Sequence, residues 1–390
     1  MENKTNPNLI LFALALSAFA IGSTEFISVG LMPLLMQDFG ISMELAGLTV
    51  SIYALGITIG APILAVLTNH WPKKRLLLLI MLVFIIGNVT VATAPNFTVV
   101  LIGRVVSALA HGLFMSIASI IAADVVAPSH RASAIAVMFT GLTVATVTGV
   151  PLGTFIGQIS TWHVSFYFIA LIGVFGLIAN YFLIPNDLPR GKKTSFMGVV
   201  RVLKNKFILM ALLITALGYG ATFTVYTFIT PILQNMMHWS SNAIVLILVI
   251  YGLMVAVGNT IGGRFANQNI LPTLVKMFLG LLITLILFLL LMGNHWLGLF
   301  NVMLLGLFAF MNVPGLQLYI VQMAEKYTPN DISIASALNI SAFNIGITLG
   351  SLLGGQTVSK IGLIATPIFG IIMVALSILL TLYLSRQNTL

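Results

Sequence analysis

Long apolar runs recur from one end of the chain to the other, and they limit the structures that it can form. Each run has about 18 or more mostly apolar residues, enough for a helix to cross a hydrocarbon core of roughly 30 Å. With 59% hydrophobic and 6% charged residues, the chain has the composition of an integral, all-α membrane protein. The sequence predicts twelve transmembrane helices, at 9–36, 45–68, 75–93, 98–124, 133–157, 164–184, 207–233, 241–262, 272–292, 297–323, 332–357 and 361–385.

The basic residues gather on one side of the predicted spans. All Lys and Arg residues except Arg104 and Lys360 lie in or next to the N-terminal segment, the connections after even-numbered spans, or the C-terminal end. The positive-inside rule places these segments, and both termini, in the cytoplasm. The net charge of +9 therefore indicates topology rather than a nucleic-acid partner. A separate lipid-binding role for the basic cluster at 190–206 is the alternative.

The two halves of the chain repeat each other at a nearly constant offset. Gly22 recurs as Gly220, and Tyr53 recurs as Tyr251, each 198 residues later. Parallel repeats related by a pseudo-twofold axis along the membrane normal are typical of rocking transporters, with the substrate site between the halves. The pattern predicts an N-terminal six-helix bundle at 1–184, a cytoplasmic linker at 185–206 and a C-terminal six-helix bundle at 207–390.

Three ionisable side chains interrupt the apolar spans of the first half, namely Glu25, Arg104 and His111. A charge near the bilayer centre costs on the order of 3 kcal/mol on insertion scales, so such residues usually face a cavity or pair with one another. The architecture itself does not require these charges, because their counterparts in the second half are Phe223, Leu307 and Pro314. The sequence therefore predicts a proton-coupling site where Glu25 binds and releases a proton beside Arg104 and His111.

Two simpler interpretations of these residues stay open. Glu25 and Arg104 also suit a static ion pair that locks the first span to the fourth. His111 also suits a hydrogen-bonded interior histidine, although it is the other candidate for the proton carrier.

Polar residues at the predicted cytoplasmic ends of the spans are candidate gate residues. Asn69, Lys73 and Lys74 lie between the second and third spans, and Asp124 ends the fourth. We expect Asp124 to pair with Lys73 or Lys74 in an exposed bridge worth at most about 1 kcal/mol, which can break repeatedly. The alternative is that these cations only orient the helices.

The fifth predicted span holds the hinge candidates Gly149, Pro151 and Gly153. Proline removes a backbone hydrogen bond and kinks a helix, and glycine lets neighbouring helices come close. Together these residues suit a moving element, although each alone also suits a fixed packing kink.

Several short segments resemble one transporter family. They are TEF at 24–26, YALGITIGAP at 53–62, GRVVSALAHGLF at 103–114, GVPLG at 149–153 and FNIG at 343–346. In this order they resemble the major facilitator superfamily, and within it the drug:proton antiporter-1 group and its bacterial sugar-efflux and arabinose-inducible exporter branch. The resemblance implies two six-helix bundles, alternating access, and export in exchange for inward protons. It also implies a proton-transfer role for Arg104 and an antiporter element at 149–153.

The chain departs from the pattern of this family at two places. Asn69 replaces the aspartate of the loop after the second span, and Pro72 and Lys73 replace its Gly-Arg pair. Pro151 lies one position later than the usual Gly-Pro pair. These departures put the usual charge relay of the gate in question.

The candidate solute-binding residues mix aromatic and uncharged polar side chains, which suits a small neutral or amphipathic solute such as a sugar, a nucleoside or a drug. They are Thr24, Phe26, Tyr53, Met115, Phe223, Tyr226, Thr227, Asn312, Gln317, Asn339 and Asn344. Singly, most of them also suit packing.

The sequence thus predicts a monomeric, proton-coupled exporter whose partners are a small-molecule solute, protons and the lipid bilayer. A proton-independent facilitator or an uptake transporter on the same fold is the alternative, and a membrane enzyme is a remote one. The chain has no HExxH or GxSxG motif, and its six His are scattered, so we expect no enzymatic activity, metal or cofactor. The absence of Cys excludes disulfides and cysteine metal sites.

Overall fold

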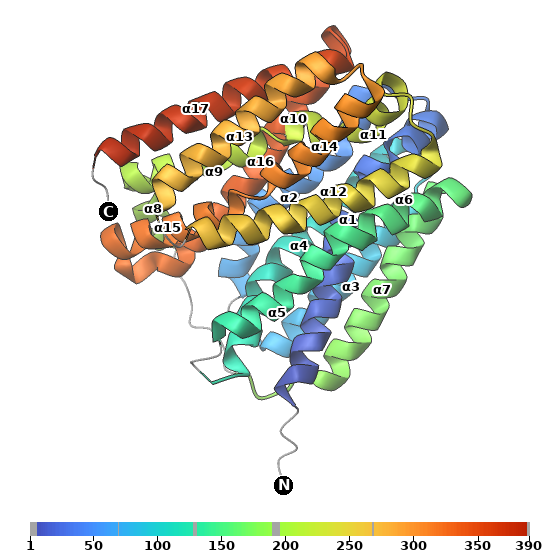
Figure 1. Ribbon diagram of the computed structural model, residues 1–390. Helices are drawn as coiled ribbons and strands as arrows, with labels where there is room; N and C mark the ends of the chain where they lie inside the picture. Colours follow the sequence, from blue (N-terminus) through green and yellow to red (C-terminus); the bar gives the residue numbers. More distant parts are fainter. Residues whose placement is uncertain (1–5, 69, 128–130, 189–195, 267–268, 388–390) are drawn as a thin grey trace. The chain divides into compact units, whose positions relative to one another are not determined.

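The computed structural model shows an α-helical protein throughout the part of the chain that it describes, residues 6–68, 70–127, 131–188, 196–266 and 269–387 (Figure 1). Twelve segments of this part are long and apolar enough to cross a membrane. The predicted fold class and the twelve predicted spans are therefore confirmed.

Most of the spans are single α-helices, and Asn side chains cap several helix starts by accepting hydrogen bonds from main-chain N–H groups. Asn96 accepts from Val99 N at 3.1 Å where α4 begins. The single helices are α1 (Pro7–Phe39), α2 (Met43–Thr68), α3 (Lys73–Ala92), α4 (Phe97–Asp124), α7 (Trp162–Leu183), α12 (Ser241–Ala266), α13 (Ile270–Leu291), α16 (Ile332–Lys360) and α17 (Pro367–Arg386). Single turns of 3-10 helix at Pro329–Asp331 and Leu363–Ala365 precede α16 and α17.

The fifth span contains a π-helical turn, which the sequence did not predict. It comprises α5 (Arg131–Val144), the π-turn η2 (Ala145–Gly149) and α6 (Val150–Ile159). The N–H of Val150 bonds to the carbonyl of Ala145, five residues back. Pro151 has no N–H to continue the α-helical ladder, so the register shifts just before it.

The seventh and tenth spans are interrupted helices. The seventh comprises α9 (Lys206–Gly220), α10 (Phe223–Tyr226), α11 (Ile229–Pro231) and the π-turn η3 (Ile232–Met236). The tenth comprises α14 (His295–Ala309) and α15 (Val313–Tyr327), and Pro314 occupies the first turn of α15, where a proline is favoured. Interrupted membrane helices need polar partners for the freed backbone groups, and they are common at binding sites in transporters.

The described residues form two compact units. The first contains the chain up to Leu34 and from Ile59 to residue 188, and α3 packs there on both α4 and α7. The second contains Leu35–Thr58 and the chain from residue 196 onward, and there α16 packs on α9, and α13 packs on α17 (Figure 1). The division into bundles at 1–184 and 207–390 with a linker at 185–206 stays a prediction.

The same close contact between two spans recurs in both units. A Cβ atom at Gly153 of α6 would overlap the side chain of Ile27 in α1, and a Cβ atom at Gly354 of α16 would overlap the carbonyl oxygen of Thr224 in α10. The two glycines lie 201 residues apart in the chain, and their contact partners lie 197 apart. The predicted repeat is therefore matched by a repeated helix contact that leaves no room for larger residues.

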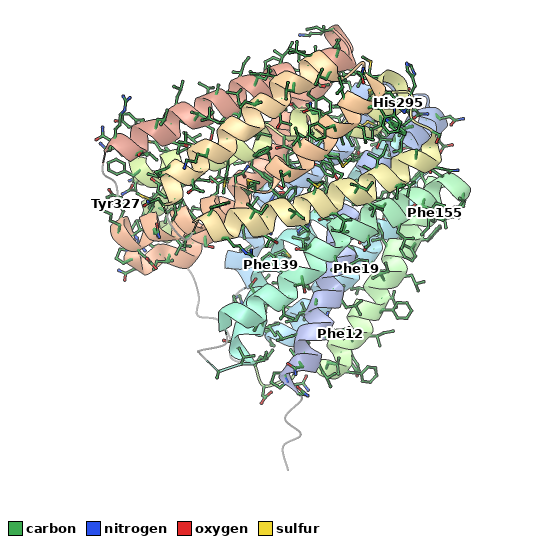
Figure 2. The ribbon with its side chains drawn as sticks, viewed as in Figure 1. Phe12, Phe19, Phe139, Phe155, His295 and Tyr327 are labelled. Carbon is green, nitrogen blue, oxygen red and sulfur yellow. The ribbon has the colours of Figure 1, made fainter. Side chains whose placement is uncertain are left out.

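Aromatic side chains mark the two ends of the second unit. His295 stacks on Trp239 with ring centroids 3.8 Å apart, and Tyr327 stacks on Phe207 with centroids 5.1 Å apart. Figure 2 shows His295 and Tyr327 at opposite ends of this unit. Amphipathic aromatic side chains gather at the two surfaces of a bilayer, so these pairs indicate where the spans leave the membrane.

Candidate functional site

Arg104 is a fully buried cation that is hydrogen-bonded to the backbone of α1. It lies on α4, and its guanidinium donates hydrogen bonds to the main-chain oxygen of Thr24 at 2.6 Å and to that of Glu25 at 2.9 Å. A helix carbonyl has a second lone pair beside the one used in the helix, so it accepts these bonds without losing its own. The contact between Arg104 and Glu25 expected from the sequence therefore includes the backbone of Glu25.

Asn88 is a second contact to this turn of α1. Its side-chain oxygen accepts a hydrogen bond from the hydroxyl of Thr24 at 3.0 Å, and its amide nitrogen donates to the carbonyl of Phe84 at 2.9 Å. Thr24 and Asn88 are both fully buried. Sequence reasoning missed Asn88, although an amide in the middle of the apolar run at 75–93 was an available signal.

Glu25 is half-buried, and it lies between the buried residues Thr24 and Phe26. His111 is almost fully buried and lies on α4, about two turns after Arg104 and on a similar face of the helix. The structure therefore places a half-buried acidic side chain on a turn of α1 that α3 and α4 hold in position. The proton-coupling role of Glu25, Arg104 and His111 stays a prediction.

The predicted pairing at the gate is present. Lys73 at the start of α3 forms a salt bridge with Asp124 at the end of α4, with 2.5 Å between nitrogen and oxygen. The bridge is not the exposed one that was expected, because Lys73 is buried and the side chain of Asp124 is only partly exposed. Lys74 instead lies over the ring of Tyr181, 5.5 Å from its centroid. Asn69, the remaining gate candidate, lies outside the described residues. The pair joins the start of α3 to the end of α4 within the first unit, and a gating role for it stays a prediction.

The hinge candidates lie where α6 packs on α1. Gly149 ends the π-turn, and a Cβ atom there would overlap the hydroxyl of Ser23, two residues before Glu25. Pro151 and Gly153 follow in the first turn of α6. A π-turn against the segment that carries Glu25 is a local irregularity of the kind often found at functional sites.

Two candidate solute-binding residues of the second unit bond to each other. Asn339 donates to the side-chain oxygen of Gln317 at 2.8 Å, and Gln317 donates to Ser336 at 2.6 Å. Thr215 of α9 in turn donates to Asn339 at 2.8 Å. This network joins α9, α15 and α16, so Gln317 and Asn339 have a structural function that the sequence did not reveal.

Other polar candidates of this unit have unsatisfied atoms. The side-chain oxygens of Asn312 and Asn344 and the hydroxyl of Thr227 are buried without a hydrogen-bond partner in the part of the chain that the structure describes. Thr227 and Asn312 lie at the interruptions of the seventh and tenth spans. A buried acceptor without a partner costs about 1–3 kcal/mol, so a donor from a solute or from water that reached these atoms would stabilise them.

An aromatic cluster surrounds these interruptions. Phe223 lies 5.1 Å from Tyr219 and 5.7 Å from Tyr226, between ring centroids, and Tyr226 stacks on Tyr251 at 4.9 Å. Phe223 and Tyr226 are among the solute-binding candidates named from the sequence. The other members of the cluster were not named, because aromatic residues are common in membrane spans. The missed members are Tyr219, Tyr251, Phe310 and Phe343.

The remaining solute-binding candidates are buried outside this cluster. Met115 lies on α4, and Tyr53 lies on the part of α2 that groups with the second unit. On the same part of α2, the hydroxyl oxygen of Ser51 lies 2.6 Å from that of Ser351.

Among the described residues, no group of three or more His, Cys, Asp or Glu side chains is arranged to hold a metal ion.

Comparison with known proteins identifies the family. Residues 14–328 match the Major Facilitator Superfamily. The chain belongs to this superfamily. The uncharacterized MFS-type transporter YtbD of Bacillus subtilis is 49% identical over 379 residues, 97% of this chain and 96% of YtbD. A probable sugar efflux transporter of Helicobacter acinonychis is 29% identical over 358 residues, 90% of this chain and 89% of that protein.

Solved structures of other transporters share the fold. The crystal structure of a D-xylose-proton symporter matches with a TM-score of 0.80 and 13% identity, over 96% of this chain and 97% of that one. The family resemblance drawn from the sequence motifs is thus confirmed. Together with the twelve spans, membership of this transporter superfamily makes the protein a multi-pass protein of the bacterial inner membrane.

Proposed function

We propose that this transporter is a solute:proton antiporter that exports a small neutral or amphipathic solute by alternating access. The observation that carries the proposal is the turn of α1 at Glu25, which Arg104 and Asn88 hold by hydrogen bonds. Loss of water favours a neutral carboxyl group, whereas a nearby guanidinium favours the carboxylate. A carboxylate held on a fixed turn therefore takes up or releases a proton when water access or solute occupancy changes.

The difference between the two halves supports this division of roles. Positions 25 and 104 hold Glu and Arg in the first half, and the corresponding positions of the second half hold Phe223 and Leu307. Phe223 is fully buried within the aromatic cluster. The first half thus carries the titratable groups, and the second half carries aromatic and amide groups suited to a solute.

The chemistry of the second unit favours a solute with an apolar ring face and several hydroxyl groups. Aromatic rings suit such faces, and this unit supplies several, among them the mutually stacked Tyr226 and Tyr251. The unpaired oxygens of Asn312 and Asn344 are acceptors for hydroxyl donors. The relative described as a probable sugar efflux transporter supports the same class. Sugars are therefore the first solutes to test, before nucleosides and hydrophobic drugs.

The remaining features of the proposal concern orientation and movement. We place both termini in the cytoplasm because basic residues gather on that side. On this orientation Lys73 and Asp124 form a cytoplasmic gate pair, and the π-turn with Pro151 and Gly153 gives the bending element. The transporter acts as a monomer, since each chain carries both halves of the repeat.

The test is solute flux in proteoliposomes under an imposed pH gradient, with labelled sugars, nucleosides and cationic dyes as candidate solutes. Wild-type protein is expected to move one of these classes only when the gradient is present, and Glu25→Gln is expected to remove that dependence. Glu325→Gln, on the exposed surface of α15, is the matched control and is expected to behave as wild type. Solute flux in the wild-type protein that is independent of the gradient would instead indicate a facilitator.

A further inference from the structure

A short amphipathic helix lies directly before the seventh span. This helix, α8 (Phe196–Lys204), is followed by Asn205, whose side chain accepts hydrogen bonds from Phe207 N at 3.0 Å and Ile208 N at 3.2 Å and so caps α9. One residue separates α8 from a helix that crosses the membrane. Because α9 begins at the bilayer surface, α8 lies at that surface too.

One side of α8 is fixed to the second unit. Arg201 donates two hydrogen bonds to the buried carboxylate of Asp331, from Nε at 2.9 Å and from Nη2 at 2.8 Å. Val202 is fully buried, and a Cβ atom at Gly198 would overlap the side chain of Ile334 in α16. A bidentate Arg–carboxylate contact fixes the orientation of α8 as well as its position, so the side of the helix that faces outward is defined.

The outward side of α8 combines apolar and basic residues. Met197, Val200 and Leu203 are 60%, 42% and 41% exposed, and Lys204 is exposed beside them. The helix contains no acidic residue. A helix with an apolar surface flanked by cations is typical of segments that lie in the headgroup region of a bilayer.

Neighbouring aromatic residues place this surface at the level of the lipid headgroups. Phe207 stacks on Tyr327, and the ammonium groups of Lys206 and Lys326 lie over these rings at 5.0 Å and 5.6 Å from the centroids. Figure 1 shows α8 at the end of the second unit where α17 ends, and Figure 2 shows Tyr327 at the same end. Aromatic rings and cations together are typical of a membrane–water interface.

We propose that the outward side of α8 is a lipid-binding surface for anionic phospholipid headgroups, into which Met197, Val200 and Leu203 insert. Charge complementarity favours lipid over a second copy of this chain, because the chain has only 8 acidic residues, and two of them, Asp124 and Asp331, are already paired. The anionic surface of a membrane supplies many negative charges next to an apolar layer. The α8 surface thus joins the linker to the bilayer beside the second unit, and this inference does not depend on what the protein transports.

The natural absence of Cys permits a direct test, since a single introduced Cys carries a nitroxide without background labelling. Labels at Val200→Cys and at Asn330→Cys, an exposed position beside Asp331, are compared in reconstituted vesicles for collisions with oxygen and with a water-soluble nickel complex. The label at position 200 is expected to collide mainly with oxygen, and the label at position 330 mainly with nickel. Leu203→Cys repeats the measurement in case the first variant folds poorly.

Changing the lipid composition separates the electrostatic contribution to the membrane association of α8 from the apolar one. Replacing neutral phosphatidylcholine with a mixture containing phosphatidylglycerol is expected to increase the oxygen preference at position 200. Lys204→Gln is expected to weaken the association of α8 with the anionic surface about fivefold, the effect of one cation near such a surface. Equal nickel access at positions 200 and 330 would overturn the proposal, as would a label shielded from both reagents, which indicates a protein partner. A lipid-exposed label that ignores phosphatidylglycerol would overturn the anionic preference.

Discussion

Arg104 Nη2 lies 2.9 Å from the main-chain oxygen of Glu25, so a buried cation on α4 holds the turn of α1 that carries the carboxylate. Because Arg104 bonds to main-chain atoms, its contribution to folding can be measured separately from its contribution to proton coupling. The carbonyls of α1 keep their helical hydrogen bonds without Arg104, and the matching position of the second half holds Leu307.

Arg104→Leu is therefore expected to fold and to lose coupling. The desolvation cost of the buried guanidinium is removed together with its hydrogen bonds, so the two effects on the free energy of unfolding oppose each other. Gradient-driven transport is expected to fall to background. Arg104→Lys is expected to retain only part of the gradient-driven transport, because an ammonium group lacks the planar guanidinium geometry that reaches two acceptors at once. Thermal unfolding in detergent and flux in proteoliposomes measure the two effects; normal coupling in the Leu variant would refute the role of Arg104.

Thr24 and Asn88 form a buried pair whose strength a double-mutant cycle measures. Thr24→Val and Asn88→Leu are each expected to lower the free energy of unfolding, with a coupling energy of about 1 kcal/mol between them. Both variants are also expected to shift the pH profile of transport, because they loosen the turn next to Glu25. Thr90→Val, at a half-buried site on α3 whose hydroxyl bonds only within its own helix, is the control and should leave the profile in place. If the pH profile of transport is the same in all variants, Asn88 has a structural role only.

The pair of Lys73 and Asp124 gives a third prediction. Lys73→Gln and Asp124→Asn are each expected to lower the free energy of unfolding by about 1 kcal/mol, as for a partly exposed ion pair. Lys74→Gln is the matched control, since Lys74 lies over Tyr181 instead. If the pair acts as a gate, the first two variants also change the rate of solute exchange. Equal effects of Lys73→Gln and Lys74→Gln, with no effect of Asp124→Asn, would mean that only the positive charge of this segment matters.

The pair of Arg201 and Asp331 is expected to hold α8 across the physiological pH range. Its hydrogen bonds lower the pKa of Asp331 from its ordinary value of 3.8. A carboxyl group whose pKa is lower in the folded state stabilises the fold above its unfolded value and loses this contribution as pH falls through the folded value. A nitroxide at Met197→Cys should therefore show constant mobility from about pH 5 to pH 8 and loosen only in stronger acid.

Asp331→Asn tests the same contact without a change of pH. It removes the charge that Arg201 binds, so the label at position 197 is expected to be mobile at every pH. A label that loosens between neutral pH and pH 5 in the wild-type protein would show that another titrating group controls α8.

The spans were predictable because length and apolar composition determine whether a helix crosses a bilayer. The interruptions of the seventh and tenth spans were not, although Pro231 and Pro314 are visible in the sequence. Their positions depend on contacts between distant segments, such as Gly220 against Gly346, where a Cβ atom would meet main-chain atoms. Such contacts leave little local signal.

The same limit applies to the candidate site. Opposite charges at the ends of adjacent spans predicted the pair of Lys73 and Asp124. The hydrogen bonds of Arg104 were not predictable, because their acceptors are main-chain carbonyls, which every residue has. The hydrogen bond between Gln317 and Asn339 was not predictable either, because the two residues lie on different spans; their solute-binding role stays a prediction.

The most direct test of the central claim measures the proton itself. When an exported solute is added to the purified transporter in weakly buffered detergent solution, a pH-sensitive dye is expected to report proton release from the wild type and from the Glu325→Gln control. The Glu25→Gln variant should bind the solute and release no proton, because its amide has none to give up. Release from that variant equal to that of the wild type would contradict the account and assign the proton to another group.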